Sequence, residues 1–246
     1  MTFDQSEFDV RCEWGEPGIS QLAPISDVVI IVDVLSFSTC VDIATSRNAR
    51  VFPCRWKDES ARAFAAALDA TLADSRRSSA GFTLSPHSLL NLPEGARLVL
   101  PSPNGSSLTL ATGTTPTLTG CLRNYQAVAS VAQHVGKRIA VIPAGERWIG
   151  DATLRPAFED WLGAGAIISQ LAGSLSPEAR AAGAAFRDAR AEIDGLLRQC
   201  SSGKELIERG FEQDVALAGE LNVSECVPIF TDGAYVQYDS RRPGSA

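Results

Sequence analysis

No apolar run in this sequence is long enough to cross a membrane, for which about 20 residues would be needed. Its start, MTFDQSEFDVRCEWGE, carries acids early and lacks the apolar stretch of a secretion signal. The six cysteines form no C-x-x-C pair, and His87 and His134 lie far apart, so neither a disulfide framework nor a zinc site is indicated. We therefore expect a cytoplasmic protein whose cysteines are reduced and mostly buried.

Several motifs of nucleotide-binding proteins and hydrolases are also missing. No G-x-G-x-x-G follows a predicted strand, no G-x-x-x-x-G-K-[ST] occurs, and no G-x-S-x-G is present. Asp33 is followed by Val34 and Leu35, so it lacks the second acid that a haloacid-dehalogenase-type phosphatase needs two residues later. The formal net charge of −7 argues against nucleic acid as a partner. It permits a small anionic ligand, because local dipoles and bound cations decide such binding.

What the chain does have is an alternation of apolar strands and amphipathic helices. This alternation predicts a three-layer α/β/α fold with a mainly parallel or mixed central sheet, in one domain over residues 1–240 with a disordered tail at 241–246. The predicted strands are an edge strand near Phe8–Cys12, then Val28–Leu35, Arg50–Cys54, Arg97–Leu100, Thr117–Cys121 and Arg138–Pro143, and a terminal hairpin of Val227–Thr231 and Tyr235–Tyr238. The predicted helices are Ser38–Asn48, Lys57–Ala73, Gln126–Val135, Arg155–Leu171, Pro177–Gln199, Ser202–Arg209 and Asp214–Leu221, with a helix start at Leu108–Thr112 and a long loop, Asp74–Pro93, that contains one turn at Ser88–Asn91.

Polar residues follow four of the predicted strands. In parallel sheets, ligands bind at the carboxyl ends of the strands. Asp33 ends a strand that is apolar on both faces, so its ionised carboxylate needs a cation or hydrogen-bond donors. The other strand ends carry Asn104-Gly105, Arg123-Asn124 and Gly145-Glu146. We therefore expect a functional site where these strand ends meet.

Two segments carry candidate phosphate-binding groups: the hydroxyl-rich turn after Asp33, and Pro103–Ser107. Glycine allows close backbone approach, and serine or threonine at a helix start can cap the helix or bind an anion. The alternative interpretation is a turn and a helix cap without a ligand. The candidates are Ser36, Ser38, Thr39, Asn104, Gly105, Ser106 and Ser107, with Arg123 and Asn124 from another strand end.

Four acids are candidates for binding a divalent cation. Asp33 and Glu146 follow predicted strands, and Glu159-Asp160 lies near the start of a predicted helix. Hard cations such as Mg²⁺ prefer oxygen ligands and usually keep some of their water, so two or three acids suffice. Other roles stay open, because Glu159-Asp160 can stabilise the helix dipole and Glu146 can pair with Arg147 or Arg155.

The order and spacing of these pieces resemble the 2-phosphosulfolactate phosphatase family from about Val28 to Pro228. The resemblance implies Mg²⁺-dependent hydrolysis of a phosphate ester on a small sulfonated hydroxy acid, in coenzyme M synthesis. Asp33, Glu159 and Asp160, with Glu146 as a further candidate, then hold the Mg²⁺. Asp33 and Glu159 are the catalytic candidates, and Asp33 either attacks phosphorus or orients a water. The matching segments are VDVLSFST (Val32–Thr39), LSP (Leu84–Pro86), PNGSS (Pro103–Ser107), GCLRNYQAV (Gly120–Val128), PAGE (Pro143–Glu146) and EDWLGAGAII (Glu159–Ile168).

The sequence also departs from the family pattern. Ser36 stands where the family commonly has arginine, and Leu84 where it has asparagine before Ser-Pro. His87-Ser88 replaces an acid after that Ser-Pro pair, and Ser102-Pro103 replaces Thr-Thr. Losing an arginine removes a bidentate anion clamp, which Arg123 from another strand end can replace. These changes weaken the assignment of the substrate more than that of metal-assisted hydrolysis.

Two other functions remain open from the sequence alone. One is a non-catalytic binder of a phosphorylated or sulfonated metabolite, and the other is a fold whose strand ends only cap helices. The expected partner is a small anionic phosphoester, without nucleic acid or membrane. A homodimer is compatible with the sequence but is not required by it.

Overall fold

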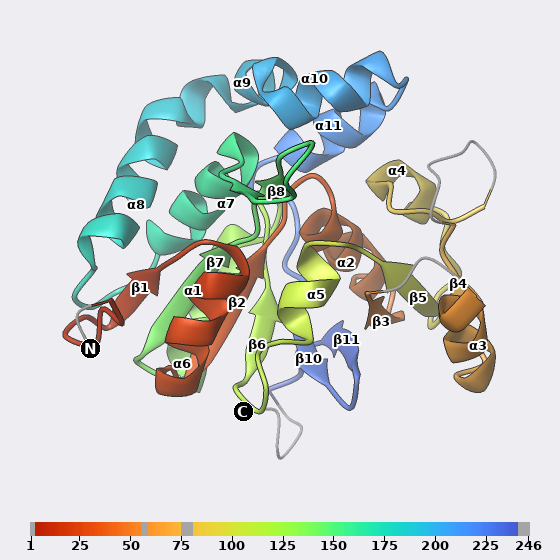
Figure 1. Cartoon of the computed structure of the whole chain (residues 1–246), viewed down its shortest axis with the longest axis horizontal. Helices are drawn as coiled ribbons and strands as arrows, with labels where there is room; N and C mark the ends of the chain where they lie inside the picture. The colour runs from red at the N-terminus through yellow and green to blue at the C-terminus, as the bar shows by residue number, and fades with distance from the viewer. Residues whose placement is uncertain (1–2, 56–58, 75–80, 241–246) are drawn as a thin grey trace.

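One large sheet organises the structure. Across residues 3–55, 59–74 and 81–240, which the computed structural model describes, the sheet has nine strands and carries helices on both faces (Figure 1). The predicted three-layer α/β fold with a mixed sheet is confirmed. The strands lie in the order β1 (Val10–Cys12), β7 (Ile139–Pro143), β2 (Val28–Val32), β6 (Thr117–Thr119), β10 (Pro228–Thr231), β11 (Ala234–Gln237), β3 (Arg50–Cys54), β5 (Arg97–Pro101) and β4 (Thr71–Leu72).

Two blocks of parallel strands are joined by an antiparallel hairpin. β1, β7, β2 and β6 pair in parallel, and so do β3, β5 and β4. The hairpin β10–β11 lies between the blocks and pairs antiparallel with β6 on one side and with β3 on the other. Three antiparallel steps therefore separate β6 from β3, and the two blocks run in opposite directions. The expectation that β2 and β5 end at one edge of a parallel sheet is wrong.

The helices bury both faces of the central strands, which is why β2 is apolar throughout. Val28, Ile30 and Val32 pack into one core cluster, and Val29 and Ile31 pack into another on the opposite face. The first cluster includes residues of α6 (Tyr125–Val135), α7 (Phe158–Ile168) and α8 (Pro177–Ala189), and the second includes residues of α1 (Gly15–Leu22) and α5 (Gly105–Thr109).

The remaining helices cover the β3–β5 pair and one end of the molecule. α2 (Phe37–Thr45) and α4 (Pro86–Leu89) pack on one face of the β3–β5 pair, and α3 (Glu59–Ala67) packs on the other. Helices α8, α9 (Ile193–Gln199), α10 (Ser201–Glu208) and α11 (Glu212–Gly219) form an arc along one end of the molecule (Figure 1). Within the described residues, none of the helices is both long and apolar enough to span a membrane.

Three predicted helices differ from the structure. The helix expected over residues 57–73 is α3 followed by β4, because Asp69 has a φ of 48° and ends the helical backbone. The helix expected from Arg155 begins at Phe158, and Arg155 instead belongs to β9 (Leu154–Arg155), which pairs with β8 (Glu146–Arg147). Pro156 accounts for this start, since a residue before proline disfavours helix.

The long helix expected over residues 177–199 is divided by a 3₁₀ turn at Arg190–Glu192 into α8 and α9. The helical turn in the long loop is α4, two residues earlier than predicted. Residues 56–58, which include the predicted start of the helix at Lys57, residues 75–80 and the predicted tail at 241–246 lie outside the described residues.

Candidate functional site

Asp33 lies at the end of β2 and is held by two backbone amides. Its Oδ1 accepts a hydrogen bond from the Phe37 amide at 3.1 Å, and its Oδ2 accepts one from the Gly105 amide at 2.9 Å. Only 7% of Asp33 is exposed. Phe37 begins α2 and Gly105 begins α5, which packs against both β2 and β3. The chain after β5 therefore reaches Asp33 through α5, although β5 and β2 run in opposite directions.

Asn104 and Glu146 form the second part of the site. The Asn104 Nδ2 donates a hydrogen bond to the Glu146 Oε2 at 3.0 Å, which joins the end of β5 to β8. Both residues line the same small cavity as Asp33, with a volume of about 190 Å³. The predicted convergence of Asp33, Asn104-Gly105 and Glu146 is thus found in the structure. The residues lining this cavity are Asp33, Leu35, Ser36, Leu84, Ser102, Pro103, Asn104, Glu146, Ser202, Glu205, Leu206 and Arg209.

Asp160 lies behind this cavity and ties two strand ends together. Its Oδ1 accepts a hydrogen bond from the Val34 amide at 2.7 Å, and its Oδ2 accepts one from the Gly145 amide at 2.8 Å. These amides follow β2 and β7, so Asp160 fixes the backbone on both sides of the acidic site. Burial, followed by repulsion from Asp33 and Glu159, raises the pKa of the Asp160 carboxyl well above its usual range.

Glu159 precedes Asp160 on α7 and has a different environment. Only 2% of the residue is exposed, and its Oε2 has no hydrogen-bond partner within the part of the chain that the structure describes. A buried carboxylate oxygen without a donor is costly, which makes it a fitting place for a cation or an ordered water. The helix-dipole interpretation does not account for an oxygen left without a partner in this way.

The negative charge of the site is poorly compensated. Burial and then repulsion from Asp33 raise the pKa of Glu146 to about 7, although the hydrogen bond from Asn104 opposes the shift. Within the described residues, no ion pair joins Glu146 to Arg147 or Arg155. The alternative in which Glu146 pairs with either arginine is therefore not seen.

The carboxylates of this site fit Mg²⁺ if water and substrate phosphate complete the coordination shell of the metal ion. No group of three or more histidine, cysteine, aspartate or glutamate side chains gathers with metal-binding geometry among the described residues. Mg²⁺ commonly uses only one or two carboxylates and completes its shell with water and substrate phosphate. Asp33 and Glu146, which line one cavity, supply such a pair. Glu159 does not line that cavity, but its buried Oε2 is a further acceptor, and its charge acts on Glu146.

The raised pKa of Glu146 predicts that the metal-free protein loses stability as the pH rises. A carboxyl that binds its proton more tightly when folded contributes stability below its unfolded pKa, here 4.5, and this contribution is lost as the pH rises through about 7. At 1.36 kcal/mol for each pH unit, the loss is on the order of 3 kcal/mol, an upper limit because the side chain is only partly buried. Thermal unfolding in EDTA from pH 5 to pH 8 measures it.

Glu146→Gln serves as the matched variant for this experiment. It keeps an oxygen for Asn104 and removes the titration, so its melting temperature should fall less over the same range. Asp27, whose pKa is lowered to about 2, titrates in the opposite sense, but only below its ordinary value of 3.8. An unchanged pH slope in the glutamine variant would remove Glu146 as the cause.

Three of the predicted phosphate-binding hydroxyls are structural. The Thr39 Oγ1 donates to the Val34 carbonyl at 2.8 Å, and the Ser106 Oγ donates to the Leu100 carbonyl at 2.9 Å. The Ser38 Oγ accepts the Asp33 amide at 2.9 Å and also bonds the Thr119 hydroxyl at 2.7 Å. All three are fully buried, so they stabilise the turns that carry the site and do not face its cavity. Ser36 does line the cavity, and Ser107 lines a neighbouring one that shares Asn104 and Glu146.

Arg123 and Asn124 also have structural partners. The Arg123 Nε donates to the Asp42 Oδ2 at 3.0 Å, and its Nη1 pairs with Glu220. Asn124 accepts the Cys121 amide at 2.9 Å and donates to the Cys226 carbonyl at 3.0 Å. Neither residue lines the cavity at Asp33. The expectation that Arg123 replaces the missing arginine of the site is therefore not supported.

The sequence-based site lacked the residues that α10 contributes. Ser202, Glu205, Leu206 and Arg209 all line the cavity, although they lie about 170 positions after Asp33. No local motif marks them, because their place depends on how the helical arc packs over the strand ends. Ser102, which departs from the family pattern, lines the cavity as well.

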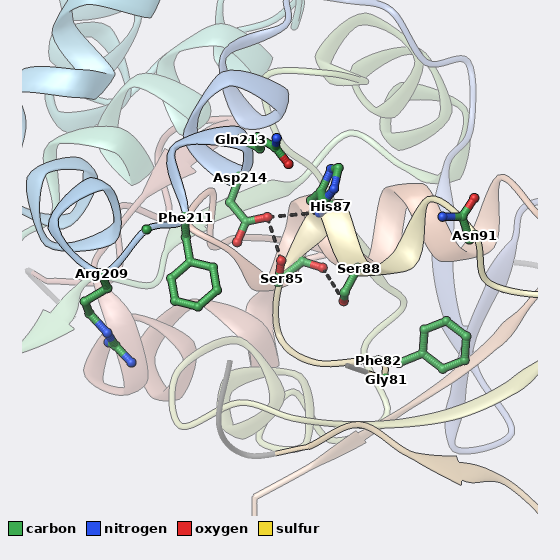
Figure 2. A pocket seen from close by; sticks show the side chains of 11 residues that line it. Gly81, Phe82, Ser85, His87, Ser88, Asn91, Arg209, Phe211, Gln213 and Asp214 are labelled. Atoms are coloured by element: carbon green, nitrogen blue, oxygen red, sulfur yellow. Dashed lines mark hydrogen bonds between the residues drawn. The ribbon is translucent and has the colours of Figure 1, made fainter. Parts of the chain in front are cut away.

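A larger cavity of about 820 Å³ adjoins the site (Figure 2). The Asp214 Oδ1 accepts hydrogen bonds from the Ser85 Oγ at 2.7 Å and from the His87 amide at 2.9 Å, which ties the α4 segment to α11. His87 is exposed, and it lines this cavity but not the one at Asp33. Arg209 lines both cavities.

Comparison with known proteins assigns the chain to a family. The family model described as 2-phosphosulpholactate phosphatase matches residues 18–233. The chain belongs to the 2-phosphosulfolactate phosphatase family. The match includes every residue that lines the cavity at Asp33. The chain is therefore a member of a family of phosphatases, and the resemblance drawn from the sequence is confirmed.

Three curated relatives support this assignment. The 2-phosphosulfolactate phosphatase of Methanothermobacter thermautotrophicus is 31% identical over 214 residues, which cover 85% of this chain and 88% of the relative. A probable 2-phosphosulfolactate phosphatase of Pseudothermotoga lettingae is 24% identical over 222 residues, covering 87% of this chain and 95% of the relative. A probable 2-phosphosulfolactate phosphatase of Carboxydothermus hydrogenoformans is 28% identical over 210 residues, covering 81% of this chain and 84% of the relative.

Proposed function

We propose that this chain is a cytoplasmic, Mg²⁺-dependent phosphatase that hydrolyses a small anionic phosphomonoester such as 2-phosphosulfolactate. The observation that carries the proposal is the cavity in which Asp33, Asn104 and Glu146 meet at the ends of β2, β5 and β7. Phosphatase chemistry follows from the family, and the substrate is suggested by the names of the relatives.

Asp33 and Glu146 would hold the Mg²⁺, directly or through water, and Glu159 would add a buried oxygen. When bound, the metal ion neutralises charge on the phosphoryl oxygens. Asp160 acts through the backbone, because both of its oxygens are engaged by the Val34 and Gly145 amides. It is therefore better described as a residue that positions the site than as a ligand with free lone pairs on the cavity side.

The chain's own donors then orient the phosphoryl group. Asn104 Nδ2 and the hydroxyls of Ser36 and Ser102 line the cavity and can donate to phosphoryl oxygens. Asp33 keeps its carboxylate fixed by the Phe37 and Gly105 amides, and the residue lines the same cavity. This fixed carboxylate would bind the metal ion, orient a water or attack the phosphorus atom.

A panel of phosphoesters tests this function. Purified protein is incubated with 2-phosphosulfolactate, 2-phosphoglycerate, phosphoglycolate and phosphoserine, with Mg²⁺ or with EDTA, and released phosphate is measured. We expect release that requires Mg²⁺ and is fastest with 2-phosphosulfolactate. No metal-dependent release from any ester would count strongly against a phosphatase. Saturable binding heat without product would instead support the non-catalytic binder.

A further inference from the structure

The cavity at Asp33 carries more negative than positive charge. Asp33, Glu146 and Glu205 are its acids, and among the described residues that line it Arg209 is the only cation. A phosphate ester is itself an anion, so it needs N–H donors and positive charge in addition to a metal ion. Arg123, the arginine that the sequence suggested for this task, is occupied by Asp42 and Glu220.

Arg209 is placed to supply this charge. It caps the C-terminal end of α10, where its backbone amide donates to the Glu205 carbonyl at 3.2 Å. Because it lines both the small cavity and the larger one beside it, its side chain lies at the junction of the two. Figure 2 shows it near Phe211, at the end of the larger cavity opposite Asn91.

The present partner of Arg209 is easily replaced. Its Nη1 donates to the Glu205 Oε1 at 3.0 Å, one helical turn earlier, with 54% of the arginine and 67% of the glutamate side chain exposed. Exposed pairs at this spacing contribute little, because water competes for both charges. The Nε and Nη2 groups make no hydrogen bond within the described residues, so a second oxyanion can bind there.

We propose that Arg209 is a substrate-binding residue that exchanges Glu205 for an oxyanion of the phosphoester. Glu205 then competes with the substrate for the same guanidinium. The oxyanion is either the phosphoryl group or the second acidic group of the ester, since both present paired oxygens to the arginine fork. This inference rests on the proposed phosphatase function and adds a residue that no strand end supplies.

Two substitutions with opposite expected effects test this competition. Arg209→Gln removes a charge-assisted bond and should raise KM by about 10- to 100-fold, with a far smaller change in kcat. Glu205→Gln removes the competitor and should lower KM by about twofold. Arg209→Lys keeps the charge but loses the fork, so its KM should lie between those of the wild type and Arg209→Gln. Arg198→Gln is the control, because Arg198 on α9 pairs with Asp194 and Glu212 and lines neither cavity.

Calorimetry identifies the oxyanion. Weaker binding of inorganic phosphate to Arg209→Gln assigns Arg209 to the phosphoryl group, and unchanged phosphate binding with a raised KM assigns it to the second acidic group. If the wild-type protein turns over no ester, the phosphatase function fails, and weaker binding of 2-phosphosulfolactate to Arg209→Gln than to the wild type still supports Arg209. Unchanged KM and ligand affinity in Arg209→Gln, or a shift of KM in the same direction for Arg209→Gln and Glu205→Gln, would overturn the inference.

Discussion

Replacing Asp33 by asparagine is expected to lower kcat by about a thousandfold or more. A carboxylate that binds the metal ion or attacks phosphorus contributes several kcal/mol to the transition state, and each 1.36 kcal/mol is a factor of ten in rate. The neutral amide keeps the shape of the side chain but loses the charge. Steady-state kinetics at saturating Mg²⁺ measure the loss.

The same substitution is also expected to weaken the fold slightly. Both Asp33 oxygens accept backbone amides, and the amide nitrogen of asparagine must face one of these N–H groups, from Phe37 or Gly105. One unsatisfied amide costs about 1–3 kcal/mol. Asp42→Asn is the matched control. Asp42 is also buried and binds Arg123 and Ser224 outside the cavity, so this variant should lose stability without losing kcat. Full activity in the Asp33 variant would remove it from the mechanism.

The two roles considered for Asp33 differ in stereochemistry. Attack by Asp33 requires two displacements and leaves the configuration at phosphorus unchanged, whereas attack by an oriented water requires one and inverts it. Hydrolysis of an ester that is chiral at phosphorus therefore assigns the role in the wild-type protein.

Asp160→Ala should have the largest effect on stability, lowering the free energy of unfolding by about 3 kcal/mol. It leaves the Val34 and Gly145 amides without an acceptor in a buried place, at about 1–3 kcal/mol each, while relief of repulsion from Asp33 and Glu159 offsets part of the cost. Urea unfolding in EDTA measures the change.

Substitution of Glu159, the neighbour of Asp160 on α7, should affect stability differently. Glu159→Gln removes a buried charge from an oxygen that has no hydrogen-bond partner among the described residues, so the metal-free variant should be as stable as the wild type or more stable. Equal losses of stability in the two variants would show that the carboxylates act only as packed side chains.

The sequence alone predicts the structural elements that depend on a local pattern of residues. The β-branched run of β2 and the turn residues Asp232-Gly233 between the last two strands predict elements that the structure contains. β4 is missed because Ala70–Ala73 continues the apolar stripe of a helix, and only the positive φ of Asp69 interrupts it. The central position of β10–β11 is not predicted, since strand order depends on long-range pairing.

The candidate site likewise contains residues that the sequence predicts and residues that it does not predict. The strand-end residues Asp33, Asn104 and Glu146 are predicted correctly to meet, because each follows a recognisable strand. Whether a hydroxyl faces the cavity depends on side-chain packing, so Ser38 and Ser36, two positions apart, have different roles. Arg209 has no local signal and enters only through the position of α10.

The central hairpin also governs when this protein can fold. Residues 228–237 are made after the other seven strands that the structure describes in this sheet, yet they join β6 to β3. Until the ribosome has released them, both blocks present open edges that can pair with other chains. Asp33 belongs to one block, and Asn104 and Gly105 follow a strand of the other, so the cavity forms only after this last step. Long-range closure of this kind is slow, and we expect the nascent chain to depend on protection from aggregation during synthesis.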